Sequence, residues 1–524
     1  MSGLSRATWF ALGFAALHLA LAWMMRDPGF GWGEDNSAFL LLSRELQHFQ
    51  YRETQDILAP VHARFPPGFP AMLAVIGTLV GDRIEPLIAF VALCSAASVL
   101  LLFDTVRRVL GEELAVLSTG LYAINASALG DAGGLMSEAP FKLFMLLALW
   151  AASRESEGTR FAVIAGGATI LAALTRTAGV VFIPALGAYW LWKRRYTWVF
   201  GLALASIPVA AWLAFSFNAP DASDRRLYVA DLKGSHETVS DALLTRLGNL
   251  RPRIEWYLTR HIPWALSIPT IQGTPVDNIV WVISFLLFGT IGMVAFLRNW
   301  VPAALFLASY GLLLAAWRFA LDRLVNPIVP LTYALLLTGV SAAFGRYVPR
   351  ARRWAVLAAA ILLTIGAIRR VAPDLKTRLA CDRTAPASSP SCWPVPEREL
   401  LTLANWVRDS TPADALFFVS KERAFFVHTG RKTINQDRAL REDTTSLGEY
   451  LRSRGVTHTV LTPVGVRARS HALRLKGACR EFDLVKQISR RTVLLQVAPE
   501  SSPTDSTPAC TAIRQFDAAG RPAR

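Results

Sequence analysis

The chain has 524 residues, of which 53% are hydrophobic and 18% are charged. Soluble domains carry about a quarter charged residues, so this composition excludes an ordinary soluble enzyme and predicts that most of the chain lies in a membrane. The formal net charge of +16 does not by itself indicate a nucleic-acid partner, because cytoplasmic loops of membrane proteins also collect Arg and Lys. High apolar content and only five Cys exclude a disordered chain and a disulfide scaffold.

Stretches without charge follow one another along most of the chain. A spanning helix needs about 20 apolar residues, or fewer where its end opens into a protein cavity. We therefore expect a polytopic α-helical membrane protein with about 11 transmembrane helices in residues 1–368, inserted in the inner (cytoplasmic) membrane. The expected spans are 7–25, 86–103, 113–130, 138–152, 161–174, 177–192, 198–216, 279–297, 301–317, 324–344 and 354–368.

Basic residues in alternate loops set the expected orientation, because short loops rich in Arg and Lys stay in the cytoplasm. The first exterior loop is then 26–85 and the large exterior loop is 217–278. If 161–174 and 177–192 were a single span, the orientation of every later span would be reversed. Within the first loop, the segment FPPGFPAMLAVIGTLVGDRIEP holds an apolar stretch of only about 14 residues. This stretch is too short to span and is expected to form a helix lying in the interface. The basic loop residues are Arg107, Arg108, Arg154, Arg160, Lys193, Arg194, Arg195, Arg298, Arg346, Arg350, Arg352 and Arg353.

The C-terminal region has a different pattern. ERELLTLANWVRDS and SLGEYLRSRG have helical spacing, whereas ALFFVS, HTVLTP and RTVLLQV are typical of short buried strands. Residues 372–498 are therefore predicted to form an exterior, periplasmic α/β domain, and residues 499–524, which include PESSPTDSTPA, a flexible tail.

Four of the five Cys lie in this exterior region. An oxidising compartment permits two disulfides among them, with three possible pairings, and free thiols are the alternative. None of the four has the C-x2-C spacing of a metal site. They are Cys381, Cys392, Cys479 and Cys510.

Acidic residues stand at the expected exterior ends of helices. Glu34 and Asp35 follow the first span beside Trp32, which predicts an amphipathic helix resting on the membrane. They can start that helix as caps, or one of them can act as a general base, since partial dehydration moves a carboxyl pKa towards neutrality. Asp131 and Glu138 bracket the second exterior turn. A carboxylate at the depth of Glu138 is costly unless it is paired or faces water, so a functional role is expected.

Basic residues gather in the same exterior segments. Each alone could anchor a lipid headgroup or pair with an acid. Together they indicate a basic cavity around acids, which suits an anionic lipid phosphate beside a general base. These residues are Arg64, Arg176, Arg318, Arg323 and His261, with His62 and Arg260 nearby in sequence.

The order of these features resembles the GT-C class of polyprenyl-phosphate-sugar-dependent glycosyltransferases. The motifs are the acidic pair after the first span, RFPPGFP before a short apolar helix, MSEAPFKLF opening a later span, LTRTAGVVFIP and DRLVNPIVPL. Similar families are the aminoarabinose transferases of lipid A and the protein O-mannosyltransferases. The resemblance covers residues 7–345 and implies a GT-C-like membrane fold.

The resemblance also implies roles for single residues. Asp35 matches the catalytic base, because it stands four residues before the aromatic Phe39, whereas Glu34 precedes Asp35 and so departs from the common Asp-Glu order. Arg64 matches a position that meets the lipid phosphate. Further basic positions of the cavity are matched by Arg176 and Arg323, with Arg318 and His261 as additional phosphate ligands. No cofactor is certain, but second-loop acids hold a divalent cation in some relatives, so possible metal ligands are Asp35, Asp131 and Glu138.

The expected reaction is transfer of a sugar from a polyprenyl-phosphate donor to a hydroxyl of an unidentified lipid, glycan or protein acceptor on the exterior face, with inversion. Asp35 would take the acceptor proton while basic residues stabilise the departing phosphate. The alternative from another class is a transporter or flippase of an anionic glycolipid, although no internal repeat typical of transporters is visible. The lipid bilayer is an expected partner, and nucleic acid is not.

Overall fold

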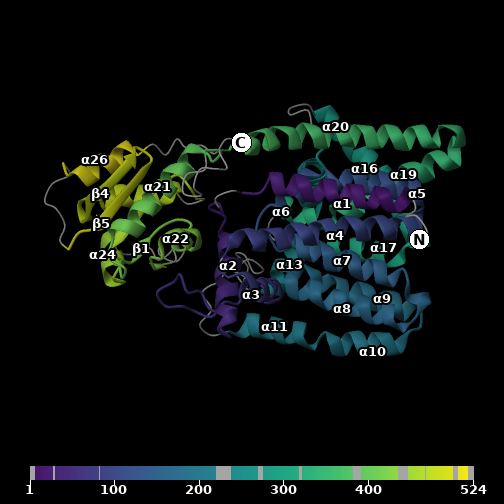
Figure 1. Ribbon diagram of the computed structural model, residues 1–524, viewed down its shortest axis with the longest axis horizontal. Helices are drawn as coiled ribbons and strands as arrows, with labels where there is room; N and C mark the ends of the chain where they lie inside the picture. The colour runs from purple at the N-terminus through teal and green to yellow at the C-terminus, as the bar shows by residue number, and fades with distance from the viewer. Residues whose placement is uncertain are drawn as a thin grey trace. The chain divides into compact units, whose positions relative to one another are not determined.

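The computed structural model describes most of the chain and divides it into two compact units (Figure 1). The first unit comprises Met1–Arg26 and His62–Lys376, and the second comprises Asp27–Val61 and Thr377–Arg524. This division differs from the predicted domains, because most of the loop 26–85 belongs to the same unit as the C-terminal region. The described residues are 6–27, 30–81, 83–219, 238–248, 250–268, 275–317, 321–381, 391–434, 446–465, 468–499 and 506–516.

The first unit is helical. Each of the eleven expected spans coincides with one or more helices, and the expected interfacial segment forms α3. The helices are α1 (Arg6–Met24), α3 (Gly68–Val80), α4 (Ile84–Leu110), α5 (Glu112–Ala123), α6 (Ala126–Ala132), α7 (Glu138–Ala152), α8 (Thr159–Thr175), α9 (Phe182–Trp192), α10 (Tyr196–Ala205), α11 (Ile207–Asn218), α13 (Val239–Gly248), α14 (Leu250–Trp256), α15 (Ile262–Ala265), α16 (Pro275–Asn299), α17 (Val301–Ala316), α18 (Asp322–Val325), α19 (Val329–Tyr347) and α20 (Arg352–Leu379).

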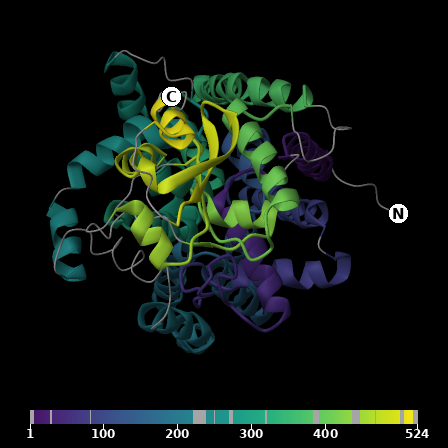
Figure 2. The same cartoon turned by 90° about the vertical axis from the view of Figure 1, so that its left-hand side faces the viewer.

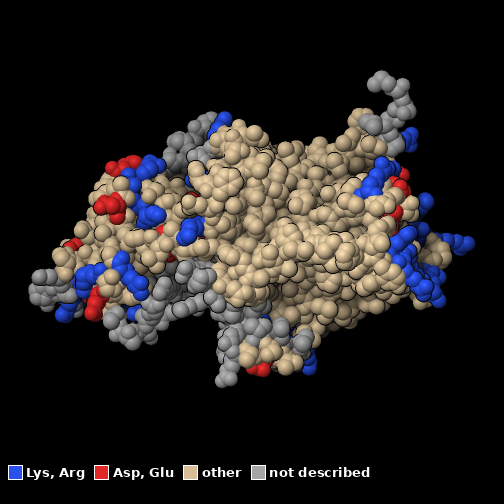
Figure 3. All heavy atoms as spheres, turned by 90° about the horizontal axis from the view of Figure 1, so that it is seen from below, with Lys and Arg blue, Asp and Glu red and all other residues tan. Residues whose placement is uncertain are grey.

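Six helical segments among the described residues are long and apolar enough to cross a membrane. They are Arg6–Met24, Ile84–Leu110, Tyr196–Asn218, Ile279–Asn299, Asp322–Tyr347 and Pro349–Leu379. The chain is therefore a multi-pass membrane protein, and the total of eleven spans stays a prediction. Figure 3 shows that the middle of the helical unit is nearly free of charged side chains on the face in view, while Lys and Arg gather at its right-hand end. This distribution is the one that helices surrounded by lipid require, because unpaired charges are costly there.

Packing between helices fixes the interior of the first unit. Helix α7 lies between α4 and α8, and α16 packs along α19 (Figure 1). The buried residues of α7 include Phe141, Met145 and Leu149, which recur at helical spacing and face one continuous core. This core also buries Glu138 and Lys142, so α7 carries charged groups into an apolar interior.

The second unit contains a five-stranded sheet with the order β2-β1-β3-β5-β4 (Figure 2). Strand β1 is parallel to β2 and β3, whereas β5 is antiparallel to β3 and β4. The elements are α2 (Glu34–Gln47), α21 (Val395–Ser410), β1 (Phe417–Phe418), α22 (Glu422–Thr429), β2 (Thr433–Ile434), α24 (Leu447–Ser453), β3 (His458–Leu461), α25 (Ala468–Gly477), β4 (Phe482–Ser489), β5 (Thr492–Val497) and α26 (Pro508–Gln515).

Helices cover both faces of this sheet because neighbouring strand residues point to opposite sides. Phe417 and Leu494 pack with α21 and α22, whereas Phe418 and Leu495 pack with α24, α25 and α26. The strands expected in ALFFVS, HTVLTP and RTVLLQV are present. The sequence analysis missed β4, whose residues FDLVKQIS are largely half-buried and lack a continuous apolar run.

The expected flexible tail 499–524 needs correction, because residues 508–515 form α26. Ala509 and Ile513 recur at helical spacing and are completely buried, and Cys510 forms a disulfide with Cys479. The low-complexity composition just before this helix concealed it. The second disulfide joins Cys381 to Cys392, which selects one of the three possible pairings and excludes the free-thiol alternative.

Candidate active site

The acidic pair occupies the first turn of α2. The residue before the helix is Gly33, which has no side chain to cap it, so Glu34 and Asp35 are helical residues and not the N-cap pair that one interpretation of the sequence proposed. Negative charge is stabilised in a first turn, since the helix dipole is positive there. Both residues are partly exposed, and successive helical side chains point about 100° apart, so the two carboxyl groups face different surroundings.

The carboxyl group of Glu34 faces α22. Its Oε1 atom is buried without a hydrogen-bond partner among the described residues. Burial raises the pKa of this carboxyl, although the charges of Arg423 and Lys421 oppose that shift. Glu34 is therefore attached to the C-terminal part of its unit, while Asp35 remains the candidate base of the first loop.

In the helical unit, Glu138 is the centre of a basic cluster. Its side chain is completely buried at the start of α7. The Oε1 atom lies 2.6 Å from Nη1 of Arg176 and also accepts a hydrogen bond from Nε of Arg323. Arg176 Nη1 donates to Ser137 Oγ as well, at 3.2 Å. Two of the predicted phosphate ligands are thus brought together on a predicted second-loop acid.

Local structure explains the position of Arg176. Helix α8 ends at Thr175 because Arg176 adopts an extended backbone, with φ −151° and ψ 128°. The turn that follows lies against α8, and a Cβ on Gly179 would come 2.7 Å from the carbonyl carbon of Ala172. A glycine is therefore required at this close approach, and the turn points the guanidinium group back towards the start of α7, where Glu138 lies.

The loop that carries Arg64 packs against the same helix end. A Cβ on Gly68 would lie 2.6 Å from the carbonyl oxygen of Leu174, two residues before Arg176. His62 is buried, and its Nε2 accepts a hydrogen bond from the backbone N–H of Phe65 at 2.9 Å. The guanidinium group of Arg64 lies over the ring of Phe65, 5.6 Å from its centroid, and forms no salt bridge with the described part of the chain. Arg64 is consequently available to a ligand.

Asp131 has a different partner from Glu138. Its Oδ2 atom lies 2.9 Å from Nζ of Lys142, and its Oδ1 atom accepts a hydrogen bond from Nδ2 of Asn326 at 3.2 Å. Lys142 is completely buried. The sequence analysis missed Lys142 and Asn326. A Lys within an apolar span was itself an indication, because a charge at membrane depth is retained only with a partner or a function.

Two further residues, His261 and Arg318, were predicted as phosphate ligands. His261 Nδ1 lies 2.5 Å from Oδ1 of Asp322, which directly precedes Arg323 in the chain. His261 is thus held beside the same short segment, with its Nε2 buried and unpaired among the described residues. Arg318 lies outside the described residues.

A divalent cation does not fit the second-loop acids Asp131 and Glu138. Among the described residues, no group of three His, Cys, Asp or Glu side chains is arranged to hold a metal ion. Asp131 already has Lys142 as its partner, and Glu138 has two Arg partners. A metal ion would have to displace these charges. Asp35, the third possible ligand, belongs to the second unit.

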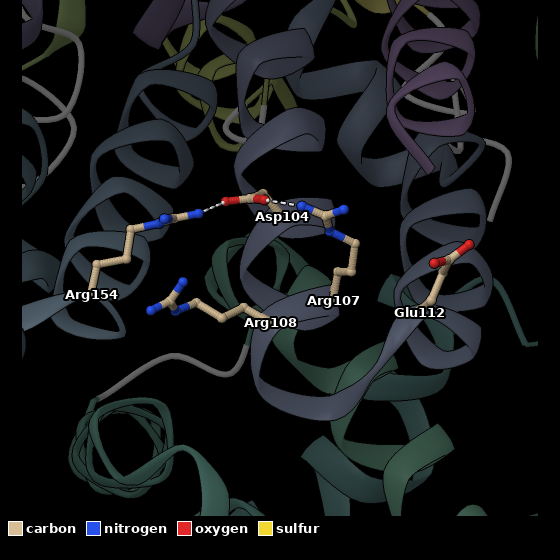
Figure 4. Close-up of a pocket in the computed structure, with 5 residues that line it drawn as sticks. All are labelled: Asp104, Arg107, Arg108, Glu112 and Arg154. Atoms are coloured by element: carbon tan, nitrogen blue, oxygen red, sulfur yellow. Dashed lines mark hydrogen bonds and ion pairs between the residues drawn. The ribbon is translucent and has the colours of Figure 1, made fainter. Parts of the chain in front are cut away.

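A second charged group lines an open pocket of about 410 Å³ at the end of α4 (Figure 4). Arg107 and Arg154 point towards Asp104 from two sides, with N–O distances of 3.1 and 2.5 Å. Arg108 pairs with Glu157. Three Arg side chains are balanced here by three acids, Asp104, Glu112 and Glu157, so the pocket has little attraction for an anion. Its Arg side chains come from loops that were predicted to be cytoplasmic.

One part of the helical unit matches a known protein family. Residues 64–216, which include Arg64, Glu138 and Arg176, match the family model described as dolichyl-phosphate-mannose-protein mannosyltransferase. A comparison with curated protein sequences gave no match.

Solved structures share the fold over almost the whole chain. ArnT from Cupriavidus metallidurans bound to undecaprenyl phosphate aligns with a TM-score of 0.59 at 12% identity, covering 95% of this chain and 100% of ArnT. The oligosaccharyltransferase AglB from Archaeoglobus fulgidus, in complex with an inhibitory peptide and a dolichol-phosphate, aligns with a TM-score of 0.52 at 12% identity, covering 91% of this chain and 73% of AglB. The resemblance to the GT-C class is therefore confirmed at the level of the fold, which the chain shares with ArnT and AglB, while its residues 64–216 match a mannosyltransferase family model.

Proposed function

We propose that the chain transfers a sugar from a polyprenyl-phosphate donor to an acceptor hydroxyl, with inversion at the anomeric carbon. The observation that carries this proposal is the cluster in which Glu138 holds Arg176 and Arg323. The match of residues 64–216 to a mannosyltransferase family and the lipid phosphates bound by ArnT and AglB support a lipid-linked donor.

The charge of the cluster suits a departing phosphate. Arg176 and Arg323 share a single carboxylate, Glu138, so positive charge remains in excess. A guanidinium group has five N–H donors, and a pairing with Glu138 leaves several of them for a phosphate. Because negative charge on the phosphate grows as the bond to the sugar breaks, the cluster stabilises the transition state more than the bound donor.

Asp35 is the proposed general base. The acceptor hydroxyl attacks the anomeric carbon while its proton passes to the Asp35 carboxylate. The bond between this carbon and the phosphate oxygen breaks, and the polyprenyl phosphate leaves with the electron pair. The sugar is transferred in one displacement, which inverts the anomeric centre.

The reaction is proposed to occur at the exterior face of the inner membrane, with the C-terminal α/β region in the periplasm. The alternation of basic loops supports this orientation. A reporter enzyme fused after Arg353 should then be cytoplasmic, and one fused after Leu400 should be exterior. Two reporters on the same side would contradict the orientation.

The decisive experiment is Asp35→Asn, because Asn keeps the size of Asp and removes the base. General-base help contributes about 10² to 10⁴ in rate. We expect a folded variant that binds the polyprenyl-phosphate sugar normally and transfers it at least about 100-fold more slowly. Asp414→Asn, on the exposed surface of the same unit, is the control and should retain full activity. Normal transfer by Asp35→Asn would overturn the assignment, and wild-type protein that binds the donor without consuming it would favour the transporter alternative.

A further inference from the structure

We propose that the C-terminal region, residues 391–516, has the function of positioning the acid-bearing helix α2, and that Glu34 and Arg423 are its main positioning residues. The inference rests on the proposed role of Asp35 as base. It follows from contacts within the second unit, four of which tie Trp32 and the segment from Glu34 to Ile57 to the C-terminal region.

The first contact is made by Trp32, two residues before α2. Its side chain is 4% exposed and belongs to the same apolar cluster as Phe417 and Leu494 of the sheet. The indole Nε1 donates to the carbonyl oxygen of Glu397 at 3.1 Å, and the ring lies 4.8 Å from that of His428. A buried Trp of this kind fixes the chain where it enters α2, since its large apolar surface is costly to expose.

The second contact lies after α2, where the loop extends the edge of the sheet. The backbone N–H of Thr433 in β2 donates to the carbonyl oxygen of Gln55 at 2.8 Å. The backbone N–H of Ile57 returns a bond to the carbonyl oxygen of Thr433 at 3.2 Å. Lys432 Nζ adds a bond to the carbonyl oxygen of Thr54 at 2.8 Å. The loop thereby pairs with an edge strand whose backbone groups would otherwise need another partner.

The third contact is a buried ion pair. Glu53 Oε2 lies 3.1 Å from Nη2 of Arg423, and the two side chains are only 3% and 8% exposed. Gln55 Nε2 also donates to Glu53 Oε2, at 2.9 Å. A charge buried in this way is destabilising without its partner, so the pair selects one arrangement of the loop against α22.

The fourth contact joins Glu34 to the start of α22. Lys421 occupies the N-cap position of this helix with φ +72° and makes no capping hydrogen bond through its side chain. The first-turn N–H groups therefore need an acceptor from elsewhere. Helix α2 packs on α22, and the Glu34 carboxyl lies at this helix start: burial raises its pKa, whereas the charges of Arg423 and Lys421 and the backbone N–H of Arg423 oppose that shift. Arg423 thus acts on Glu34 at the start of α2 and pairs with Glu53 beyond its end.

These contacts constrain Asp35, because it directly follows Glu34 in the same helical turn. A displacement of a catalytic group by about 1 Å can cost on the order of 100-fold in rate. Glu34 consequently acts through its neighbour: it positions Asp35 and does not itself take the acceptor proton.

The test uses the full-length protein and compares Glu34→Ala with Glu34→Gln. Alanine removes the carboxyl group beside the Arg423 N–H, whereas Gln keeps an amide oxygen there as an acceptor. We expect Glu34→Ala to lower kcat about 10- to 100-fold, with an unchanged donor Kd and faster amide hydrogen exchange in α2. Glu34→Gln should restore most of the rate and the slow exchange. The matched control is Arg408→Met, which removes an exposed Arg of the same region that pairs only with its neighbour Asp409 in the described part of the chain.

A second variant guards against misfolding of the first. Glu53→Gln combined with Arg423→Met removes both charges of the buried pair, so neither is left unpaired. It should fold, exchange faster in α2 and lose kcat with an unchanged donor Kd. The inference would be overturned if folded Glu34→Ala and this double variant both kept the wild-type exchange rate in α2 and the wild-type kcat. It would also be overturned if these variants lost donor binding together with kcat. If Asp35→Asn were fully active, the proposed base would be wrong, but the exchange measurement would still show whether the C-terminal region holds α2.

Discussion

Lys142 and Asp131 form an ion pair inside the helical unit, with Lys142 Nζ 2.9 Å from Asp131 Oδ2 and side-chain exposures of 0% and 7%. The pair joins α7 to α6, and Asn326 extends it to the segment that follows Arg323. It therefore connects the elements that carry the candidate phosphate ligands. A charge at this depth is kept only because its partner compensates the loss of hydration.

Lys142→Met should strongly destabilise the protein, because it leaves Asp131 charged and unpaired. Removing one partner of a buried pair costs about 3–5 kcal/mol. The double variant Lys142→Met with Asp131→Asn should recover much of this loss, since the amide oxygen of Asn can still accept the bond from Asn326. Unfolding measurements in detergent on the single and double variants test this, and a single variant as stable as wild type would refute it.

Gly68→Ala should weaken donor binding while the protein stays folded. The new Cβ would lie 2.6 Å from the carbonyl oxygen of Leu174, so either the loop of Arg64 or the end of α8 before Arg176 must shift. We expect a fall in affinity for the polyprenyl-phosphate sugar of about tenfold, or about 1.4 kcal/mol. The control is Gly167→Ala in α8, where no atom lies within 4 Å of the added Cβ. This variant should bind the donor normally.

Arg176→Lys should lose activity even though it keeps the charge. The Lys ammonium can still pair with Glu138, but it cannot bind a phosphate through two parallel N–H donors. We expect weaker donor binding and turnover reduced at least about tenfold, measured on purified protein in lipid. The control is Arg160→Lys at the exposed start of α8. Normal kinetics for Arg176→Lys would leave Arg176 as a structural partner of Glu138 or a headgroup anchor.

The second unit should lose stability in mild acid because of His471. This ring is completely buried, Nε2 lies 3.1 Å from Thr459 Oγ1, and burial lowers the His471 pKa from its ordinary value of 6.5 to about 3. Below pH 6.5 the unfolded chain binds a proton that the folded chain does not. Stability conferred by the neutral ring is therefore lost as the pH falls from 6.5 towards 3, with a slope approaching about 1.4 kcal/mol per pH unit.

His471→Leu removes this proton uptake. Thr459 Oγ1 keeps a second partner, the carbonyl oxygen of Phe418 at 3.0 Å, so the substitution leaves no isolated hydroxyl. The decline in thermal midpoint between pH 7 and pH 5 should be shallower in His471→Leu than in wild type. Equal slopes for the two proteins would contradict the assignment.

The sequence by itself predicted the apolar helices and the short buried strands, because both depend mainly on the residues within the segment. A helix surrounded by lipid is determined by a run of apolar residues, because its backbone hydrogen bonds are made within the segment. All eleven expected spans accordingly coincide with helices, and α3 was recognised as too short to span. The short strands of ALFFVS, HTVLTP and RTVLLQV were predicted from their apolar and β-branched residues for the same reason.

Only the tertiary structure decided which distant residues meet. The acids and bases of the candidate site were visible in the sequence, but the partners of Glu138 and Asp131 were not, and Lys142 was overlooked. Arg423 lies 370 positions from its partner Glu53, and Cys510 joins Cys479 across 31 positions. Such contacts depend on the packing of whole elements, because burial makes an unpaired charge or an exposed Trp32 costly. The assignment of α2 to the same unit as the C-terminal sheet is a result of that packing, and no local pattern in residues 27–61 specifies it.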